Sequence, residues 1–162
     1  MLSLDIKLAT LLAKRFDLSK EAVDNLKIAI LLYDIGNTMI PKELLGKKSA
    51  LTKEEFASIK RHPIIAAREI LEPISSVVDV IPIIEKHHEN WNGTGYPNNL
   101  SGENIPLESQ IILIVDSYFA LLENRPYRKA LSKEEALNTI LEDSNSKWSA
   151  KLANEFIATI NE

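Results

Sequence analysis

The stretch SKEAVDNLKIAILLYDIG, residues 19–36, decides the fold class of this chain. Its apolar residues recur every three or four positions, which is the period of one face of an α-helix. They are Val23, Leu26, Ala29 and Ile30. Ser19 is a residue type that commonly caps a helix at its start, and Gly36 favours a helix end. The stretch therefore predicts an amphipathic helix that begins after Ser19 and runs to Asp34.

The same helical spacing continues along most of the chain. Capping boxes at residues 52–55 and 132–135 mark two further helix starts, because each pairs a hydroxyl residue with a glutamate three positions on. Pro63 and Pro82 interrupt apolar helical runs and predict kinks or breaks there. Residues 111–115 also allow a buried strand, but the sequence offers that strand no partner. The other predicted helices are residues 4–12, 52–71, 74–88, 107–122, one that starts at 132, and 148–160.

Size and composition restrict the class of protein. A chain of 162 residues, 45% of them apolar and 26% charged, fits one globular domain over residues 1–162. The net charge of −4 argues against a DNA-binding or membrane-surface protein. The absence of cysteine excludes disulfides and thiolate metal sites. The sequence has no apolar run long enough for a membrane segment and no signal segment at Met1. We therefore expect a single-domain, all-α helical bundle in the cytoplasm.

Polar residues interrupt this apolar pattern at a few places. Asp34 and Asp116 each follow an apolar run, and an ionised carboxylate in a dry core costs several kcal/mol unless it is paired or binds a cation. His62 lies inside a predicted helix, and His87 and His88 close another. Each aspartate taken alone could be a cap or an ion-pair partner, and His62 alone could be an ordinary core histidine. Together they predict a metal site with oxygen and nitrogen ligands, of the kind that helical bundles build.

Several short motifs occur in order between about residue 17 and residue 161. They are Tyr33-Asp34-Ile35-Gly36, Ile40-Pro41, Leu51-Thr52, Lys60-Arg61-His62-Pro63, His87-His88-Glu89, residues 91–97, Ile105-Pro106-Leu107, Asp116-Ser117-Tyr118 and residues 125–130. In this order the chain resembles the HD-GYP family, a branch of the HD-domain phosphohydrolases. Members of that family are helical, bind two or three metal ions, and typically hydrolyse the bacterial messenger cyclic di-GMP to pGpG or GMP.

The resemblance assigns roles to individual residues. It makes Asp34 a bridging ligand of two metals, which also gives it a catalytic role, and Asp116 a ligand of the first metal. The second metal would be held by the three histidines His62, His87 and His88. The loop signature is Gly95-Tyr96-Pro97, which the resemblance connects with substrate positioning and with contacts to GGDEF-type or other signalling proteins. Arg125 and Arg128 would bind phosphate, which suits the fork shape of the guanidinium group.

The chain also departs from the family pattern at ligand positions. Tyr33 stands where the family has a histidine that binds the first metal, and Asn37 stands where a lysine is usual. The family further supplies a glutamate and a histidine from an earlier helix, and the histidine position falls at Met1. The amino-terminal helix is therefore expected to be truncated or degenerate. The tyrosine could fill the vacated volume or, as a phenolate, bind ferric iron, although free phenol keeps its proton up to a pKa near 10.

The remaining ligands predict one divalent transition metal, iron, manganese or zinc, and not a complete two-metal centre. Two-metal hydrolysis uses both ions to activate water and to clamp the phosphate. The preferred hypothesis is a degenerate HD-GYP domain of cyclic di-GMP signalling with little or no phosphodiesterase activity. It would bind cyclic di-GMP or pGpG, or contact a protein partner. The alternatives are an active phosphodiesterase with a reduced metal site, and a helical docking domain that binds neither metal nor nucleotide.

Overall fold

A computed structural model describes residues 2–47, 49–124 and 128–162 of the chain. The described residues form helices joined by turns and loops, and they contain two isolated β-bridges but no β-strand. The predicted all-α class is confirmed. The α-helices are α1 (Leu2–Arg15), α2 (Lys20–Leu32), α3 (Lys42–Leu45), α4 (Lys53–Ile59), α5 (His62–Ile64), α6 (Ile81–Glu85), α7 (Leu107–Leu122), α8 (Lys133–Glu142) and α9 (Ala150–Asn161). Shorter helical segments are η1 (Ile35–Met39), the π-helix η2 (Ile65–Leu71), η3 (Ser75–Val80) and η4 (Gly102–Asn104).

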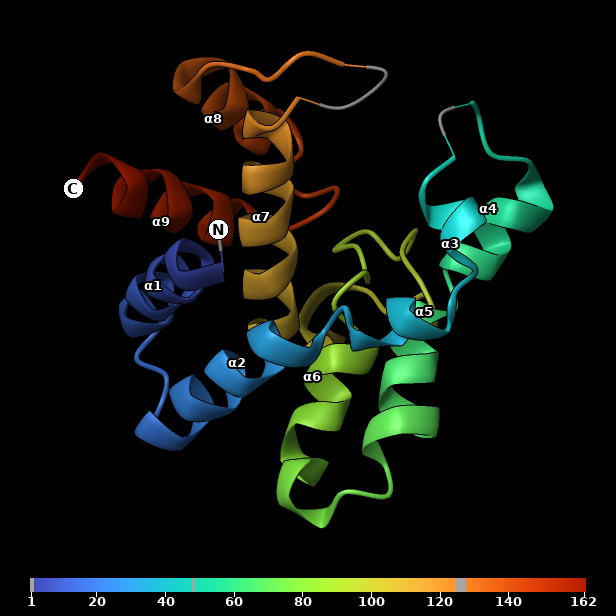
Figure 1. The fold of residues 1–162 in the computed structure, drawn as a ribbon. Helices are drawn as coiled ribbons and strands as arrows, with labels where there is room; N and C mark the ends of the chain where they lie inside the picture. The colour runs from blue at the N-terminus through green and yellow to red at the C-terminus, as the bar shows by residue number, and fades with distance from the viewer. Residues whose placement is uncertain (1, 48, 125–127) are drawn as a thin grey trace.

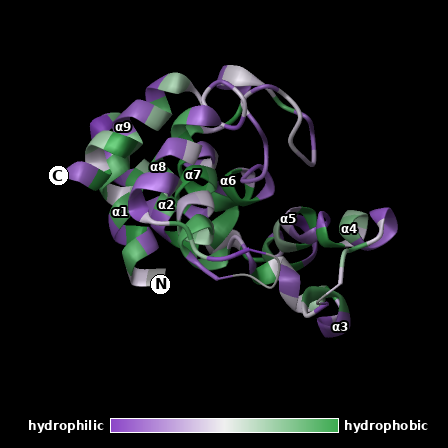
Figure 2. Cartoon of the chain, turned by 90° about the horizontal axis from the view of Figure 1, so that it is seen from above, coloured by the Kyte–Doolittle hydropathy of each residue, from purple (hydrophilic) through white to green (hydrophobic). Residues whose placement is uncertain are grey.

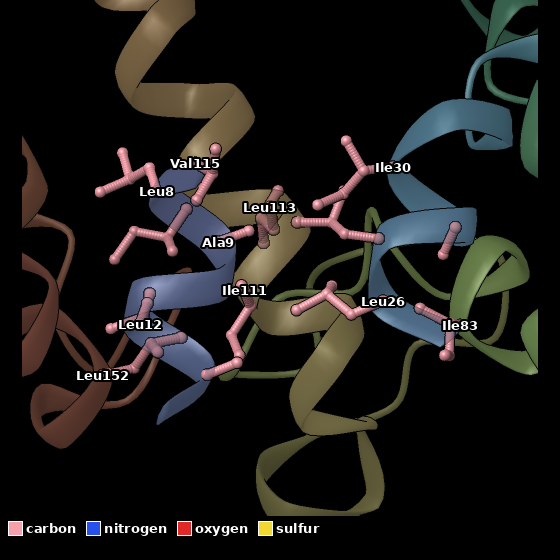
Figure 3. Packing of buried hydrophobic residues seen from close by; sticks show 14 of the residues in the cluster. Leu8, Ala9, Leu12, Leu26, Ile30, Ile83, Ile111, Leu113, Val115 and Leu152 are labelled. Atoms are coloured by element: carbon pink, nitrogen blue, oxygen red, sulfur yellow. The ribbon is translucent and has the colours of Figure 1, made fainter. Parts of the chain in front are cut away.

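Helix α7 is the centre of the bundle, with α1, α2, α8 and α9 around it (Figure 1). Its residues 109–115 are all buried, as expected of a helix that is apolar on every side. Side chains from α1, α2, α6 and α9 pack around this segment (Figure 3). The helical prediction for residues 107–122 is confirmed, and residues 111–115 do not form a strand.

The predicted helix starts agree with the structure. The Ser19 hydroxyl accepts a hydrogen bond from the backbone N–H of Ala22, and α2 follows it directly. Both predicted capping boxes are formed, at Thr52–Glu55 and at Ser132–Glu135. These local signals were sufficient because a cap involves residues that are only three positions apart in the sequence.

The two proline-containing segments are more broken than their apolar patterns indicate. Around Pro63 the predicted helix divides into α4, the one-turn α5 and the π-helix η2, because proline has no N–H for the helical ladder. Around Pro82 the expected helix over residues 74–88 is instead the 3-10 helix η3 followed by α6, which ends at Glu85. His62 and His87 consequently lie at helix ends, where their rings can reach one place.

Helices α3 and α4 form an arm that projects from the main bundle in both views (Figures 1 and 2). The arm and the turn before it expose four large apolar side chains. They are Met39, Leu45, Leu51 and Phe56, which are 62%, 44%, 36% and 49% exposed. The arm joins the bundle at α5, beside the histidines. Among the described residues, no helix is long and apolar enough to cross a bilayer.

Candidate metal and nucleotide site

Three histidine side chains meet where α5, η2 and α6 come together. One ring nitrogen of each of His62, His87 and His88 lies within 4.8 Å of the others. His62 and His87 are buried, at 4% and 1% exposed, and His88 is partly buried. The sequence prediction that these three residues share one site therefore agrees with their positions, while their role as metal ligands stays a prediction.

Backbone carbonyls orient two of the rings. Nδ1 of His62 lies 2.9 Å from the carbonyl oxygen of Ile59, and Nδ1 of His87 lies 2.6 Å from that of Ile84. A carbonyl oxygen can only accept, so each Nδ1 carries the proton and each Nε2 has a free lone pair. Histidine ligands of metals are commonly held by such a hydrogen bond on the other ring nitrogen.

The two Nε2 atoms of His62 and His87 face each other at 3.3 Å. With both protons on Nδ1, two lone pairs point toward one another, and neither has a hydrogen to donate. A cation placed among the three rings would satisfy these lone pairs, so the donor set fits a transition metal that accepts imidazole nitrogen. The residues present therefore fit the metal that the sequence predicts.

Burial keeps His87 and His88 neutral. Loss of hydration, together with the neighbouring His62, lowers the pKa of His87 to about 3 even though its bond to Ile84 acts in the opposite direction. Burial is also the main reason why the pKa of His88 falls to about 2, with smaller contributions from His87, His62 and Lys60. Neutral imidazole is the form that binds a metal ion, so His87 and His88 are in their ligand form at neutral pH.

Asp34 lies beside this cluster but at its solvent-facing edge. Its Oδ1 is 3.7 Å from Nε2 of His62, and its side chain is 55% exposed. The expectation that Asp34 is buried was wrong, because α2 ends at Leu32 and the aspartate falls in the turn that follows. Asn37 donates a hydrogen bond from Nδ2 to Oδ1 of Asp34 at 2.8 Å, so a neutral amide fixes the carboxylate.

Close packing at Gly36 brings this turn against the first histidine. A Cβ atom at Gly36 would overlap the carbonyl oxygen of His62 and lie 2.9 Å from the backbone nitrogen of Ala66. Only glycine allows the backbone of η1 to approach α5 and η2 this closely. The glycine in the Tyr-Asp-Ile-Gly motif therefore determines how near Asp34 lies to His62.

Tyr33 and Asp116 form the second half of the site. The Tyr33 hydroxyl donates a hydrogen bond to Oδ1 of Asp116 at 3.1 Å, and the Tyr33 and His87 rings pack in a T-shaped arrangement with centroids 5.1 Å apart. Burial and the negative charges of Asp116 and Asp34 raise the pKa of Tyr33 well above its usual value. The tyrosine is thus a protonated hydrogen-bond donor, which does not favour the interpretation as a phenolate ligand.

A residue that the sequence reasoning missed lies next to this pair. Asp5 of α1 lines the same small cavity as Tyr33 and Asp116, and burial raises the pKa of its carboxyl group. One signal was available, because Asp5 is an acidic residue that directly follows Leu4 in an otherwise apolar stripe. Its distance from Asp116 along the chain gave no indication that the two would meet.

The glycine-rich loop closes over the histidines. The Tyr96 ring stacks on the His88 ring with centroids 4.8 Å apart, and a Cβ atom at Gly95 would overlap backbone atoms of residues 88–90. Buried Glu89, to which the sequence reasoning gave no role, accepts hydrogen bonds from the backbone N–H groups of Asn98 and Leu100 at 2.6 and 2.9 Å. The loop signature is therefore held in direct contact with the site.

The structure describes one of the two arginines that were expected to bind phosphate. Arg125 lies outside the described residues. Arg128 donates hydrogen bonds to the carbonyl oxygens of Leu121 and Ala120 at 3.1 and 2.8 Å, so its guanidinium group caps the carboxyl end of α7. The sequence could not show this capping, because a guanidinium group can donate to carbonyl oxygens as well as to phosphate oxygens.

Comparison with known proteins identifies the family. The profile described as "HD domain" matches residues 2–152. The chain belongs to the HD domain family. The resemblance to its HD-GYP branch is also confirmed, and it rests on the relatives described next.

Two curated relatives of this HD domain are phosphodiesterases. The cyclic di-GMP phosphodiesterase response regulator RpfG of Xanthomonas campestris pv. campestris is 38% identical over 130 residues, which is 80% of this chain and 34% of that protein. The 3'3'-cGAMP-specific phosphodiesterase 1 of Vibrio cholerae is 37% identical over 127 residues, or 78% of this chain and 29% of that protein. The HD domain thus spans about a third of the length of these relatives.

A solved structure shares the fold. Bd1817, described as an HDG"Y"P protein from Bdellovibrio bacteriovorus, superposes with a TM-score of 0.77 at 22% identity, over 98% of this chain and 50% of that one. At this identity the likeness concerns the fold of the HD domain alone.

Proposed function

We propose that this chain binds a cyclic dinucleotide, with cyclic di-GMP as the first candidate, and hydrolyses it slowly or not at all. Relatives named as cyclic di-GMP and cGAMP phosphodiesterases support the ligand class. The observation that supports slow or absent hydrolysis is the hydrogen bond from Tyr33 to Asp116. The resemblance makes Asp116 a ligand of the first metal, and here a protonated phenol occupies one of its oxygens.

One divalent transition metal would be held by His62, His87 and His88, with Asp34 beside them. When bound, such an ion polarises a phosphodiester and acidifies a water molecule. The chain's own residues then account for the low activity. Asp34 accepts a hydrogen bond from Asn37, which keeps the carboxylate in place but adds no positive charge near a substrate phosphate. Tyr33 fills the place of an imidazole ligand without offering a lone pair on nitrogen.

We favour nucleotide binding over protein docking because of the position of the Tyr96 ring. Its ring stacks on His88 inside the site, and burial together with Asp34 and Asp116 raises the pKa of its hydroxyl group. A protonated phenol at the edge of the metal site is a hydrogen-bond donor for a phosphate or a guanine oxygen. A protein partner that used Gly95, Tyr96 and Pro97 would have to reach a ring that is already partly covered.

The experiment that tests the proposal combines metal analysis with binding and turnover on the same purified protein. We expect about one transition-metal ion per chain, measurable cyclic di-GMP binding by calorimetry, and little or no pGpG or GMP by chromatography after prolonged incubation with Mn²⁺ or Fe²⁺. Absence of any binding would refute the proposed ligand class. Two ions per chain would contradict the reduced site.

A second function, active metal-dependent phosphodiester hydrolysis on a reduced metal site, is supported by the preserved histidine cluster. The neutral imidazoles, oriented by Ile59 and Ile84, are those that a working site needs. This function predicts product that accumulates in proportion to enzyme and is lost in both His87→Ala and Asp34→Ala. Product that persists in either variant would come from a contaminating phosphodiesterase and not from this site.

A further inference from the structure

The ammonium group of Lys60, near the histidine cluster, contacts two aromatic rings. Its Nζ lies 4.7 Å from the ring centroid of Phe56 and 5.0 Å from that of Tyr96. The Tyr96 ring in turn stacks on His88. The ammonium group is thus held between two aromatic rings, one of which belongs to the loop that closes the site. Cation–π contacts of this kind position a charge without neutralising it.

No acid compensates the Lys60 charge among the residues that the structure describes, since no carboxylate there lies within ion-pair distance of Nζ. Other cations near the site differ in this respect. Arg68 contacts Glu72 and Glu85, and Arg61 lies 3.8 Å from Glu69. The ammonium of Lys60 also makes no hydrogen bond to a described residue, so all three of its donors are available to a ligand.

The Tyr96 ring links Lys60 to the histidine cluster, because it contacts both the Lys60 ammonium group and the His88 ring. The carboxylate of Asp34 lies 3.7 Å from Nε2 of His62, so a phosphodiester that approaches the histidines meets negative charge. Lys60 adds a positive charge that offsets part of this repulsion beside any bound metal ion, whereas Asn37 adds none.

We propose that Lys60 binds one of the two phosphates of the cyclic dinucleotide, with Phe56 and Tyr96 holding the ammonium at the mouth of the site. This inference rests on the proposed function, because it specifies how that ligand is held. A cyclic dinucleotide carries two phosphodiesters on one ring. One can therefore lie at the histidine cluster while the other contacts Lys60. Phe56, at 49% exposed, also leaves part of an aromatic face open to a base.

The test is calorimetric titration of the full chain with cyclic di-GMP, in the presence of Mn²⁺, for three variants. Lys60→Gln removes the charge, Lys60→Arg keeps it, and Arg61→Gln removes one charge from the next residue, whose side chain is 66% exposed. A charge-assisted hydrogen bond predicts that Lys60→Gln binds about 10- to 100-fold more weakly. Lys60→Arg should stay within about threefold of the parent, and Arg61→Gln within about twofold.

Salt dependence supplies a second readout. Removal of a phosphate contact lowers the slope of log Kd against log salt concentration, so Lys60→Gln should have a smaller slope than both the parent and Arg61→Gln. Equal binding by the parent and Lys60→Gln would overturn the inference while leaving the proposed function intact. Equal weakening in Lys60→Gln and Arg61→Gln would also overturn it, as a general charge effect. A parent that does not bind the nucleotide would refute the proposed function itself.

Discussion

The hydroxyl of Tyr33 donates a hydrogen bond to Oδ1 of Asp116, 3.1 Å away across 83 positions of sequence. The HD-GYP resemblance assigns this carboxylate to the first metal. Here one of its oxygens accepts a hydrogen bond from a phenol. Because burial and the surrounding carboxylates keep Tyr33 protonated, the contact persists at neutral pH. Tyr33 therefore gives the half of the site around Asp116 a hydrogen-bond donor at neutral pH.

The double variant Tyr33→His, Asn37→Lys is expected to gain metal and activity. An imidazole would add a nitrogen ligand beside Asp116, and the lysine would add positive charge next to Asp34. Elemental analysis should show more metal per chain than in the parent, and chromatography should show pGpG from cyclic di-GMP. The gain should be partial, since Tyr33→His supplies only one of the nitrogen ligands that the resemblance assigns to the first metal.

Tyr33→Phe is the matched control for that variant. It releases Asp116 from the hydrogen bond but supplies no ligand nitrogen, so its metal content should equal that of the parent. Its free energy of unfolding should fall by about 1 kcal/mol, the usual contribution of one hydrogen bond. A gain of metal in Tyr33→Phe would show that the hydrogen bond alone, and not the missing imidazole, limits metal binding.

His88→Ala is expected to weaken metal binding. The ring nitrogens of His62, His87 and His88 converge within 4.8 Å, so loss of one leaves two nitrogens. Metal affinity, measured by competition with a chelator, should fall by more than the roughly 10- to 100-fold that loss of a supporting second-shell group costs. Thr94→Ala, an exposed change in the same loop, should keep the parent affinity. Equal affinities for the two variants would argue against a metal site at the histidines.

Local signals in the sequence account for much of this fold, and long-range contacts account for what was missed. The Ser19 cap and both capping boxes were predictable because each involves residues within three positions. The resemblance brought the three histidines together. The exposure of Asp34 and the capping role of Arg128 depend on where one segment ends against another, which periodicity does not encode. The cavity neighbours Asp5 and Asp116 meet only because α1 packs on α7.

The buried histidines predict that the metal-free protein loses stability in mild acid. The pKa of His87 is about 3 in the folded chain and its usual value is 6.5, so the unfolded chain binds more protons between these limits. The free energy of unfolding should therefore decrease as pH falls below about 6.5, by up to roughly 1.4 kcal/mol per pH unit for this one group. Urea denaturation in the presence of a chelator, between pH 7.5 and pH 5, measures this slope.

His87→Gln identifies the source of that pH dependence. Glutamine does not titrate, so the variant should show a flatter curve than the parent over the same interval, whatever its absolute stability. Most carboxylates titrate below this interval, because their usual pKa values lie near 4. Burial raises the pKa of Asp5 and of Asp34, so these two would act in the opposite direction to His87, and they are present in both proteins. An identical slope in the parent and in His87→Gln would mean that other groups control the acid response.

Gly95→Ala is expected to destabilise the chain and to disturb the loop. A Cβ atom there would overlap backbone atoms of Glu89 and Asn90 and the carbonyl oxygen of His88, none of which can rotate away. Overpacking of this kind costs about 1–3 kcal/mol, and relief by moving the loop would separate Tyr96 from His88. Urea denaturation and cyclic di-GMP titration should both show a loss. Gly46→Ala is the matched control, because its new Cβ would meet only the carbonyl oxygen of Lys42, at 3.2 Å. If Gly95→Ala were as stable and bound nucleotide as tightly as Gly46→Ala, the contact between the loop and the histidine backbone would not control the site.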